Sequence, residues 1–348
     1  MDLKEKLQEL SRGQIIAIVV AVACFVALLA FLFMTFGSNE TEELDFKGAE
    51  KKTPEVKSFY WPLTNVKAPD GDAVKRRPIS MKIENSDNAR PQSGLIDADI
   101  VYETEVEGGI TRFHVLFQKD LPEIAGPLRS ARTNDVWVVS QWDSYLLYSG
   151  AADNVYAELA ATGIDMISEG RDDRVWERVS WRFAPHNLYV RIVNVPDVVP
   201  EYDVDLNSWE ERGLVFEKDS AMPPAPTVSF VTVPFQAQTA GWEWSSASRK
   251  FLRYQNGEQH TDYVSGEQLF ADNVVILWAN YADFNAGGLA TIFKHGTQQE
   301  GTWTTAPGQP PLLKDVNGKA IEFTAGKTWF EVVPLDTQID VVLLDGEM

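Results

Sequence analysis

Cysteine and histidine are scarce in this sequence: its 348 residues include one cysteine, Cys24, and four histidines. A single thiol excludes an internal disulfide. Cys24 also lies inside a long apolar run, so the rest of the chain has no thiolate for nucleophilic catalysis. The chain lacks a phosphate-binding loop, a dinucleotide-binding fingerprint, a serine-hydrolase elbow and a zinc-protease helix motif. The common enzyme classes that depend on those motifs are therefore not indicated.

Positive charge is also in short supply, because the formal net charge is −20 at pH 7. Residues 1–13 contain equal numbers of acids and bases, so the whole excess falls on the remainder of the chain. Such a surface repels nucleic acid and anionic lipid, and we expect no nucleic-acid partner. An acidic chain of this length without disulfides is typical of an exported bacterial protein held together by its core.

One long apolar segment occupies residues 15–36, IIAIVVAVACFVALLAFLFMTF, which contain no charge. As a helix, this segment spans roughly 30 Å, the thickness of a bilayer core. Basic residues precede the segment and acidic residues follow it, which predicts a cytoplasmic N-terminus. The sequence thus predicts a cytoplasmic tail (1–14), a transmembrane helix (15–36), a flexible tether (37–58) and an extracytoplasmic remainder at the cell membrane.

Two other interpretations of this segment place the chain at the same membrane surface. A cleaved signal peptide has a shorter apolar core followed by small residues, whereas this run ends in bulky side chains. The sequence around Cys24, Ala21-Val22-Ala23-Cys24, loosely resembles a bacterial lipobox, in which the cysteine is lipidated. The apolar run continues for twelve residues beyond Cys24, which favours a retained helix.

The exported part divides into two regions with different sequence patterns. Residues 59–216 alternate strand-like and helix-like runs, with helices expected near 130–142 and 154–161, and this order predicts an α/β layered domain. A linker rich in proline follows at 217–227. Residues 228–348 contain short β-type runs separated by glycine, asparagine and proline, which predicts a mainly antiparallel β domain.

A hairpin is expected in the segment ADIVYETEVEGGITRFHVLFQ, with Gly108 and Gly109 as a two-residue turn. The cross-strand pairs expected from that turn are Glu107 with Ile110, Glu105 with Arg112, and Glu103 with His114. One face would then carry three carboxylates, a guanidinium and an imidazole. The structural alternative is an ordinary half-buried hairpin whose polar face meets water.

This polar face supplies the candidate catalytic and metal-binding residues. Glu103 and Glu105 are candidates for general acid and base, with His114 as a proton carrier. Glu103, Glu105 and Glu107 are candidate ligands for a divalent metal. No other cofactor is indicated.

Arginines define the candidate ligand-binding residues. In the segment GPLRSARTND, Ser130 is a candidate helix N-cap, so Arg129 and Arg132 stand at a helix N-terminus. Cations are disfavoured there unless an anion accompanies them, which predicts a phosphate or carboxylate ligand; the alternative is that both arginines pair with the acidic hairpin. Weaker candidates lie in a loop after a strand and in a segment rich in aromatic residues. The complete set of ligand-binding candidates is Arg90, Arg112, Arg129, Arg132 and His186.

Three motifs together resemble a known family. They are the run from RPISMKIENSDNARPQSG to EVEGGITRF, then GPLRSAR, and then APHNLY, followed by a β-rich half with NVVILWANY and GTWTT. In this order and spacing they resemble the YerB-like lipoproteins, a bacterial family named as a domain of unknown function (DUF3048, N- and C-terminal domains). The resemblance implies an exported two-domain protein of the cell envelope and supplies no catalytic residues. The chain departs from the family at its N-terminus, where a clear lipobox is missing.

These observations favour a binding protein over an enzyme. The hypothesis is a membrane-anchored extracytoplasmic protein that binds an anionic cell-wall component or an envelope protein partner. Its expected pocket joins Arg90, Arg129 and Arg132 to the hairpin face. The alternative is an enzyme acting on a wall polymer or a lipid-linked precursor through carboxylates, arginines and a divalent metal.

Overall fold

The computed structural model describes residues 12–36, 58–170, 172–199, 214–218, 225–306 and 308–344. The chain forms two compact units, residues 1–56 and 57–348. In the first unit, helix α2 covers Arg12–Phe36 and leaves the Cys24 side chain exposed. Tested over the described residues, no helix is long and apolar enough to cross a membrane. The single span at 15–36 therefore stays a prediction, and the expected tail before Arg12 and tether at 37–57 lie outside the described residues.

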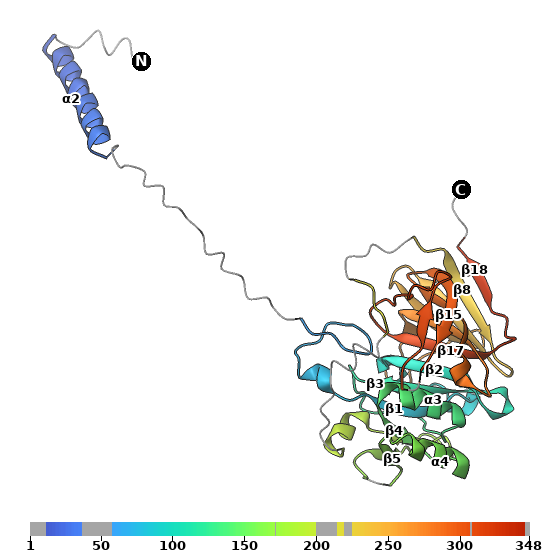
Figure 1. The fold of residues 1–348 in the computed structure, drawn as a ribbon. Helices are drawn as coiled ribbons and strands as arrows, with labels where there is room; N and C mark the ends of the chain where they lie inside the picture. The colour runs from blue at the N-terminus through green and yellow to red at the C-terminus, as the bar shows by residue number, and fades with distance from the viewer. Residues whose placement is uncertain are drawn as a thin grey trace. The chain divides into compact units, whose positions relative to one another are not determined.

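A mixed ten-stranded sheet is the centre of the second unit (Figure 1). Its order is β16-β15-β14-β13-β17-β2-β3-β1-β4-β5. The first five strands in chain order are β1 (Ile79–Glu84), β2 (Ile100–Glu105), β3 (Thr111–Phe117), β4 (Tyr145–Tyr148) and β5 (Met166–Ser168). The other five are β13 (Asn273–Ala279), β14 (Gly288–Lys294), β15 (Thr297–Thr304), β16 (Leu312–Lys314) and β17 (Thr328–Pro334).

The two sequence regions meet inside this sheet. Strand β17 pairs in parallel with β2 on one side and with β13 on the other. Both regions thus contribute strands to one hydrogen-bonded layer, and the described part of the chain is rich in β-structure with few helices. The earlier region contains the parallel neighbours β1, β4 and β5 and two helices, α3 (Thr133–Trp142) and α4 (Asp153–Ala161).

A second sheet and a short hairpin complete the β-structure. The six-stranded sheet has the order β11-β10-β9-β8-β18, with β12 paired to β10. Its strands are β8 (Val228–Pro234), β9 (Thr239–Ser245), β10 (Lys250–Gln255), β11 (Glu258–Gln259), β12 (Phe270–Ala271) and β18 (Asp340–Leu343). The hairpin consists of β6 (Trp176–Arg178) and β7 (Leu188–Val190).

Almost all side chains of strands β1, β2 and β3 are buried, on both faces of the sheet, although these strands include polar and charged residues. Helix α3 covers one face, where the Trp142 indole donates a hydrogen bond to the Tyr102 hydroxyl (3.2 Å). The opposite face packs on the second sheet, and Val115 shares a core cluster with Val231 and Trp242. Polar side chains on these strands are therefore enclosed and need partners inside the protein.

Candidate functional site

The β2–β3 hairpin pairs one residue away from the expected register. The observed pairs are Tyr102 with His114, Glu103 with Phe113, Thr104 with Arg112, and Glu105 with Thr111. The turn contains three residues, Glu107–Gly109, and the Val106 N–H donates to the Ile110 carbonyl (2.8 Å) across it. A shift of one residue moves every side chain of one strand to the other face. The expected face shared by the carboxylates, Arg112 and His114 is therefore wrong.

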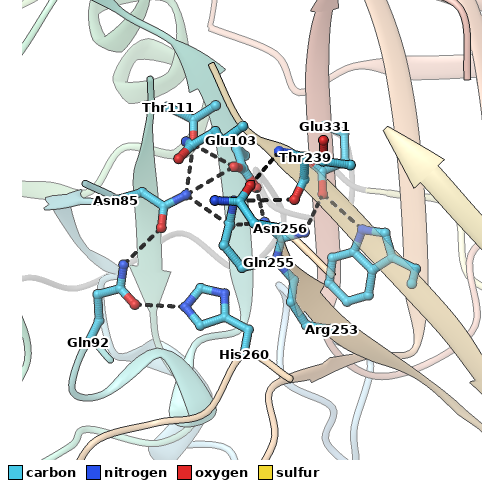
Figure 2. Close-up of polar contacts among 12 residues, drawn as sticks. Asn85, Gln92, Glu103, Thr111, Thr239, Arg253, Gln255, Asn256, His260 and Glu331 are labelled. Carbon is cyan, nitrogen blue, oxygen red and sulfur yellow. Dashed lines mark hydrogen bonds and ion pairs between the residues drawn. The ribbon is translucent and has the colours of Figure 1, made fainter. Parts of the chain in front are cut away.

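Glu103 lies fully buried between the two sheets rather than on a solvent-facing strip (Figure 2). Its carboxylate accepts hydrogen bonds from the Arg253 guanidinium (2.5 Å) and the Thr111 hydroxyl (2.5 Å). The Asn85 amide donates a third bond (3.3 Å). Glu103 is therefore held in the core by hydrogen bonds from three other side chains of the protein.

Arg253 joins Glu103 to a second buried carboxylate, that of Glu331, at 3.2 Å. The Trp242 and Trp329 rings lie 5.0 and 4.8 Å from the guanidinium carbon. Burial and the charge of Glu103 raise the pKa of Glu331 well above its usual range. Burial and the second carboxylate thus favour the protonated form of Glu331, and Arg253 favours the charged form.

Glu105 and Glu107 each have a different partner. Glu105 accepts a hydrogen bond from the Gln236 backbone N–H (2.5 Å). Glu107 accepts from Nε of Arg132 through both oxygens (2.6 and 2.9 Å). The three hairpin carboxylates thus do not converge. Among the residues that the structure describes, no group of three or more histidine, cysteine, aspartate or glutamate side chains is arranged to hold a metal ion.

Three arginines do converge, at the start of α3. Arg112 and Arg132 both donate through NH1 to the Ser130 carbonyl oxygen, at 2.9 and 3.3 Å. The pKa of Arg112 is lowered to about 10, first by burial and then by the charges of Arg132 and Arg129. Nε of Arg112 and Nε of Arg129 are buried without a hydrogen-bond partner. We call Arg112, Arg129 and Arg132 the arginine cluster.

Arg129 connects this cluster to His186. Nε of Arg129 lies 3.5 Å from one carboxylate oxygen of Glu84, and the other oxygen lies 2.8 Å from Nδ1 of His186. Glu84 is the last residue of β1 and lies opposite Arg112 in the sheet. Four of the five predicted ligand-binding residues therefore lie in one neighbourhood around the ends of β1 and β3.

A buried ion pair between Lys82 and Asp135 lies next to the arginine cluster. The Lys82 ammonium lies 2.7 Å from Asp135 of α3, and Nδ1 of His114 lies 3.0 Å from the same carboxylate oxygen. Burial favours neutral Asp135, but Lys82 and His114 outweigh it and hold the pKa of Asp135 well below its usual range. Burial lowers the pKa of His114. The other Asp135 oxygen accepts from the Arg132 N–H (2.6 Å), which fixes the first turn of α3.

A pocket of about 600 Å³ opens beside the arginine cluster. Ser130, Arg132 and Thr133 line it from the start of α3, and residues 150–152, 154 and 155 line it from the start of α4. It lies beyond the carboxyl end of β4, the parallel neighbour of β1. Ligands of open α/β sheets commonly bind at such an edge. Glu107, the partner of Arg132, is the acidic residue that lines this pocket.

Arg90 lies apart from the cluster. Its NH1 group donates to the Asn85 carbonyl (2.7 Å), and its NH2 group pairs with Asp87. The expected pocket that joined Arg90, Glu103 and Glu105 to Arg129 and Arg132 is therefore divided between several places. Arg90 lines a separate pocket of about 500 Å³.

The residues predicted from the sequence did not include those that support the cluster. Lys82 and Glu84 interrupt the apolar strand PISMKIENS at alternate positions, which places both on one strand face. Asp135 stands three residues after Arg132, a spacing typical of a helix N-terminus. Those two signals could have identified Lys82, Glu84 and Asp135.

The architecture and the pocket define a class of protein: β-rich, with a mixed central sheet and, beyond the carboxyl ends of two of its parallel strands, a pocket beside an arginine cluster. The chain belongs to the YerB-like family of proteins of unknown function. The N-terminal domain of that family, DUF3048, matches residues 63–205, and its C-terminal domain matches residues 231–330.

Two comparisons with individual proteins agree with this assignment. The chain is 29% identical over 294 residues to a protein of Bacillus subtilis (strain 168) named "Putative lipoprotein YerB", covering 80% of this chain and 87% of that protein. The crystal structure of YerB from Bacillus subtilis is similar with a TM-score of 0.69 and 26% identity, covering 81% of this chain and 99% of that one.

Proposed function

We propose that this protein is a membrane-anchored extracytoplasmic protein whose arginine cluster binds an anionic cell-wall component or an envelope protein with an anionic group. Similarity to a protein named as a lipoprotein supports a place at the outer face of a membrane. The uncharged run at 15–36 supports attachment by a single span with the N-terminus in the cytoplasm. Lipidation of Cys24 is the alternative attachment.

The observation that carries the proposed ligand is the concentration of guanidinium groups. Two of them share the Ser130 carbonyl oxygen, and the charge of the third, Arg129, contributes to the lowered pKa of Arg112. Like charges held this close disfavour one another's charged forms. A bound phosphate or carboxylate would reverse that effect and could accept from the Nε groups of Arg112 and Arg129, which donate no hydrogen bond within the protein.

The location of the cluster adds to this argument. A chain with a net charge of −20 otherwise repels anions, so three neighbouring arginines, of which Arg132 lines the pocket, are a local exception. The first turns of α3 and α4 border the same pocket, and helix N-termini favour negative charge. The guanidinium groups and the backbone dipoles therefore both favour an anionic ligand.

The enzyme alternative has less support. It requires Glu103, Glu105 or His114 to meet a substrate, but Glu103 and His114 are buried with partners inside the protein. Glu105 caps a backbone N–H of the second region. None of the three lines the pocket beside the arginine cluster.

A binding experiment tests the proposal directly. The double variant Arg129→Ala/Arg132→Ala removes two of the three guanidinium groups. Hydrogen bonds to charged groups contribute about 1.5–3 kcal/mol each, so binding to inorganic pyrophosphate and retention on purified cell wall should weaken at least about tenfold. The measurements are titration calorimetry and cosedimentation, with wall samples before and after chemical removal of their anionic polymers.

The matched control is Arg174→Ala, which removes an exposed arginine that pairs with Asp172 at the surface. It changes the net charge in the same direction without touching the pocket, and binding should stay as in the wild type. Unchanged binding in the double variant would rule out the arginine cluster as the anion site. Equal losses in the double variant and the control would reduce the effect to overall charge.

A further inference from the structure

A second pocket, of about 500 Å³, lies on the other side of the β1 end. Three residues after β1 form one wall, Asp87, Arg90 and Pro91, and residues 255, 256 and 258–261 at the end of β10 and along β11 form the other. All of its lining residues except Pro91 are polar. Its size falls within the usual range for small-molecule sites. We call it the amide pocket, because glutamine and asparagine side chains contribute much of its lining.

One lining residue, His260, has a defined tautomer. Gln92 donates through its amide nitrogen to the Glu84 carbonyl (2.8 Å), so its amide oxygen faces Nε2 of His260 (2.7 Å). Because an amide oxygen only accepts, Nε2 carries the hydrogen. Nδ1 is then an acceptor, and it is buried without a partner. Burial, with the charges of Arg253 and Arg90, holds the pKa of His260 well below its usual value and keeps the ring neutral.

Gln255 joins one wall of the pocket to the buried network that contains Glu103 and Arg253 (Figure 2). Gln255 accepts hydrogen bonds from the Asn85 amide (3.1 Å) and from Arg253 (3.1 Å). Asn256 accepts from the Thr239 backbone N–H (2.8 Å). Side chains fixed in this way lose little freedom when a ligand binds, so this part of the lining is organised in advance.

The charge of the amide pocket differs from that of the arginine cluster. Two carboxylates, Asp87 and Glu258, stand against one guanidinium, Arg90, which is already paired with Asp87. This balance disfavours an anion. Amides, carboxylates and a neutral imidazole are suited to groups that both donate and accept hydrogen bonds, and hydroxyl groups do both. A neutral polyhydroxylated ligand fits this lining best.

Exposed aromatic rings stand close to the same loop. Trp181 and Tyr263 stack at 5.8 Å with nearly parallel planes, and each is 45% exposed. Arg182 donates to the carbonyls of Asn88 and Pro91 (both 2.6 Å), which ties the aromatic segment to the pocket wall. Exposed, rigid aromatic faces of this kind offer a surface for the apolar face of a sugar ring.

We propose that the amide pocket, with Trp181 and Tyr263 beside it, binds a neutral oligosaccharide. The amide and carboxylate groups hold ring hydroxyls, and the aromatic pair contacts an adjoining sugar unit. This site is separate from the arginine cluster and does not depend on it. A protein with both sites would contact a glycan and an anionic group at the same time.

The experiment uses the full chain in a detergent without a sugar headgroup, so that the detergent does not compete. N,N′,N″-triacetylchitotriose and maltotriose serve as uncharged probes, and binding is measured by saturation-transfer NMR and tryptophan fluorescence. We expect one of the two to bind with a millimolar or tighter Kd. The variants Gln259→Ala and Trp181→Ala, both at the surface, should each weaken that binding at least about fivefold, and the control Gln298→Ala on β15 should not.

Several results would overturn the proposal. No saturation transfer to either trisaccharide would do so, as would binding that Gln259→Ala and Trp181→Ala leave unchanged. Loss of sugar binding in Arg129→Ala/Arg132→Ala, with the amide-pocket variants unaffected, would place the sugar at the arginine cluster instead. By contrast, weakened sugar binding with retained pyrophosphate binding in Gln259→Ala would support two separate binding sites.

Discussion

At the scale of single residues, Glu107 stands where an anionic ligand of the arginine cluster would bind. Its carboxylate is 69% exposed and accepts two hydrogen bonds from Nε of Arg132. The hydrogen bond from Arg132 lowers the pKa of Glu107 below its usual value, so the group is ionised at neutral pH. An external phosphate or carboxylate must compete with this internal one.

Removal of the Glu107 charge should therefore strengthen anion binding. In Glu107→Gln, Arg132 loses its charged partner, and affinity for pyrophosphate should rise about fivefold, equivalent to about 1 kcal/mol for an exposed ion pair. Titration calorimetry measures the change. Glu123→Gln is the control, because it removes a carboxylate that pairs with Arg191 at 3.2 Å, away from the pocket. Weaker binding in Glu107→Gln would mean that Glu107 helps to hold the ligand.

At the scale of secondary structure, the sequence predicted the elements better than their pairing. The expected helices at 130–142 and 154–161 correspond to α3 and α4, because apolar spacing is a local signal. The expected N-cap was wrong, since α3 begins at Thr133 and its N-cap is Arg132 rather than Ser130. The β2–β3 register depended on whether the glycine turn had two residues or three. Val106 and Ile110 close the longer turn through a hydrogen bond that the sequence does not reveal.

In the candidate site, too, local features were predicted better than contacts between distant segments. Arg112, Arg129 and Arg132 were identified from their positions near a strand start and a helix start. The partners of Glu103 could not be predicted, because Arg253 and Glu331 lie 150 and 228 residues away from it along the chain. Their contacts follow only once β17 is known to pair with β2. Contacts between such distant segments depend on sheet topology, which no local pattern encodes.

One short segment, residues 214–218, is held to the β14–β15 turn by a polar clasp. Glu217 lies 2.6 Å from the Lys294 ammonium and 2.7 Å from Nε2 of His295, and Thr324 donates to it (2.9 Å). Burial alone would raise the pKa of Glu217, but these hydrogen bonds outweigh it and lower the pKa to about 2. Because the native pKa lies below the usual value, the clasp stabilises the fold above pH 4.5 and weakens as the pH falls toward 2.

Loss of this charge should loosen the segment. In Glu217→Gln, the backbone amides of Glu217 and Phe323, which bond across the clasp, should exchange up to about fivefold faster at pH 7, equivalent to about 1 kcal/mol. Hydrogen-exchange mass spectrometry measures the rates, and the difference from the wild type should narrow as the pH approaches 2. Glu322→Gln, a change of the same charge next to the clasp, should leave both rates unchanged. Equal rates in Glu217→Gln and the wild type at pH 7 would contradict a stabilising clasp.

At the scale of the whole second unit, the two sequence regions share one sheet and one buried ionic cluster. Strands β2 and β17 pair in parallel, with Glu103 of β2 opposite Glu331 of β17. Both carboxylates contact Arg253 of the second sheet. Glu103 lies in the N-terminal family domain, residues 63–205, and Arg253 lies in the C-terminal one, residues 231–330. Disruption of the cluster therefore acts on both regions at once.

Arg253→Met tests this coupling. The substitution leaves two buried carboxylates without their guanidinium, and removal of one member of a buried ion pair costs about 3–5 kcal/mol. Urea unfolding followed by hydrogen exchange should show the amides of β4 and β14, one strand from each region, losing protection together at a lower midpoint. Arg174→Met, at an exposed ion pair, is the control and should shift neither strand. If β14 lost protection while β4 kept its wild-type midpoint, the regions would be independent folding units despite the shared sheet, since a single cooperative unit has one transition for all of its strands.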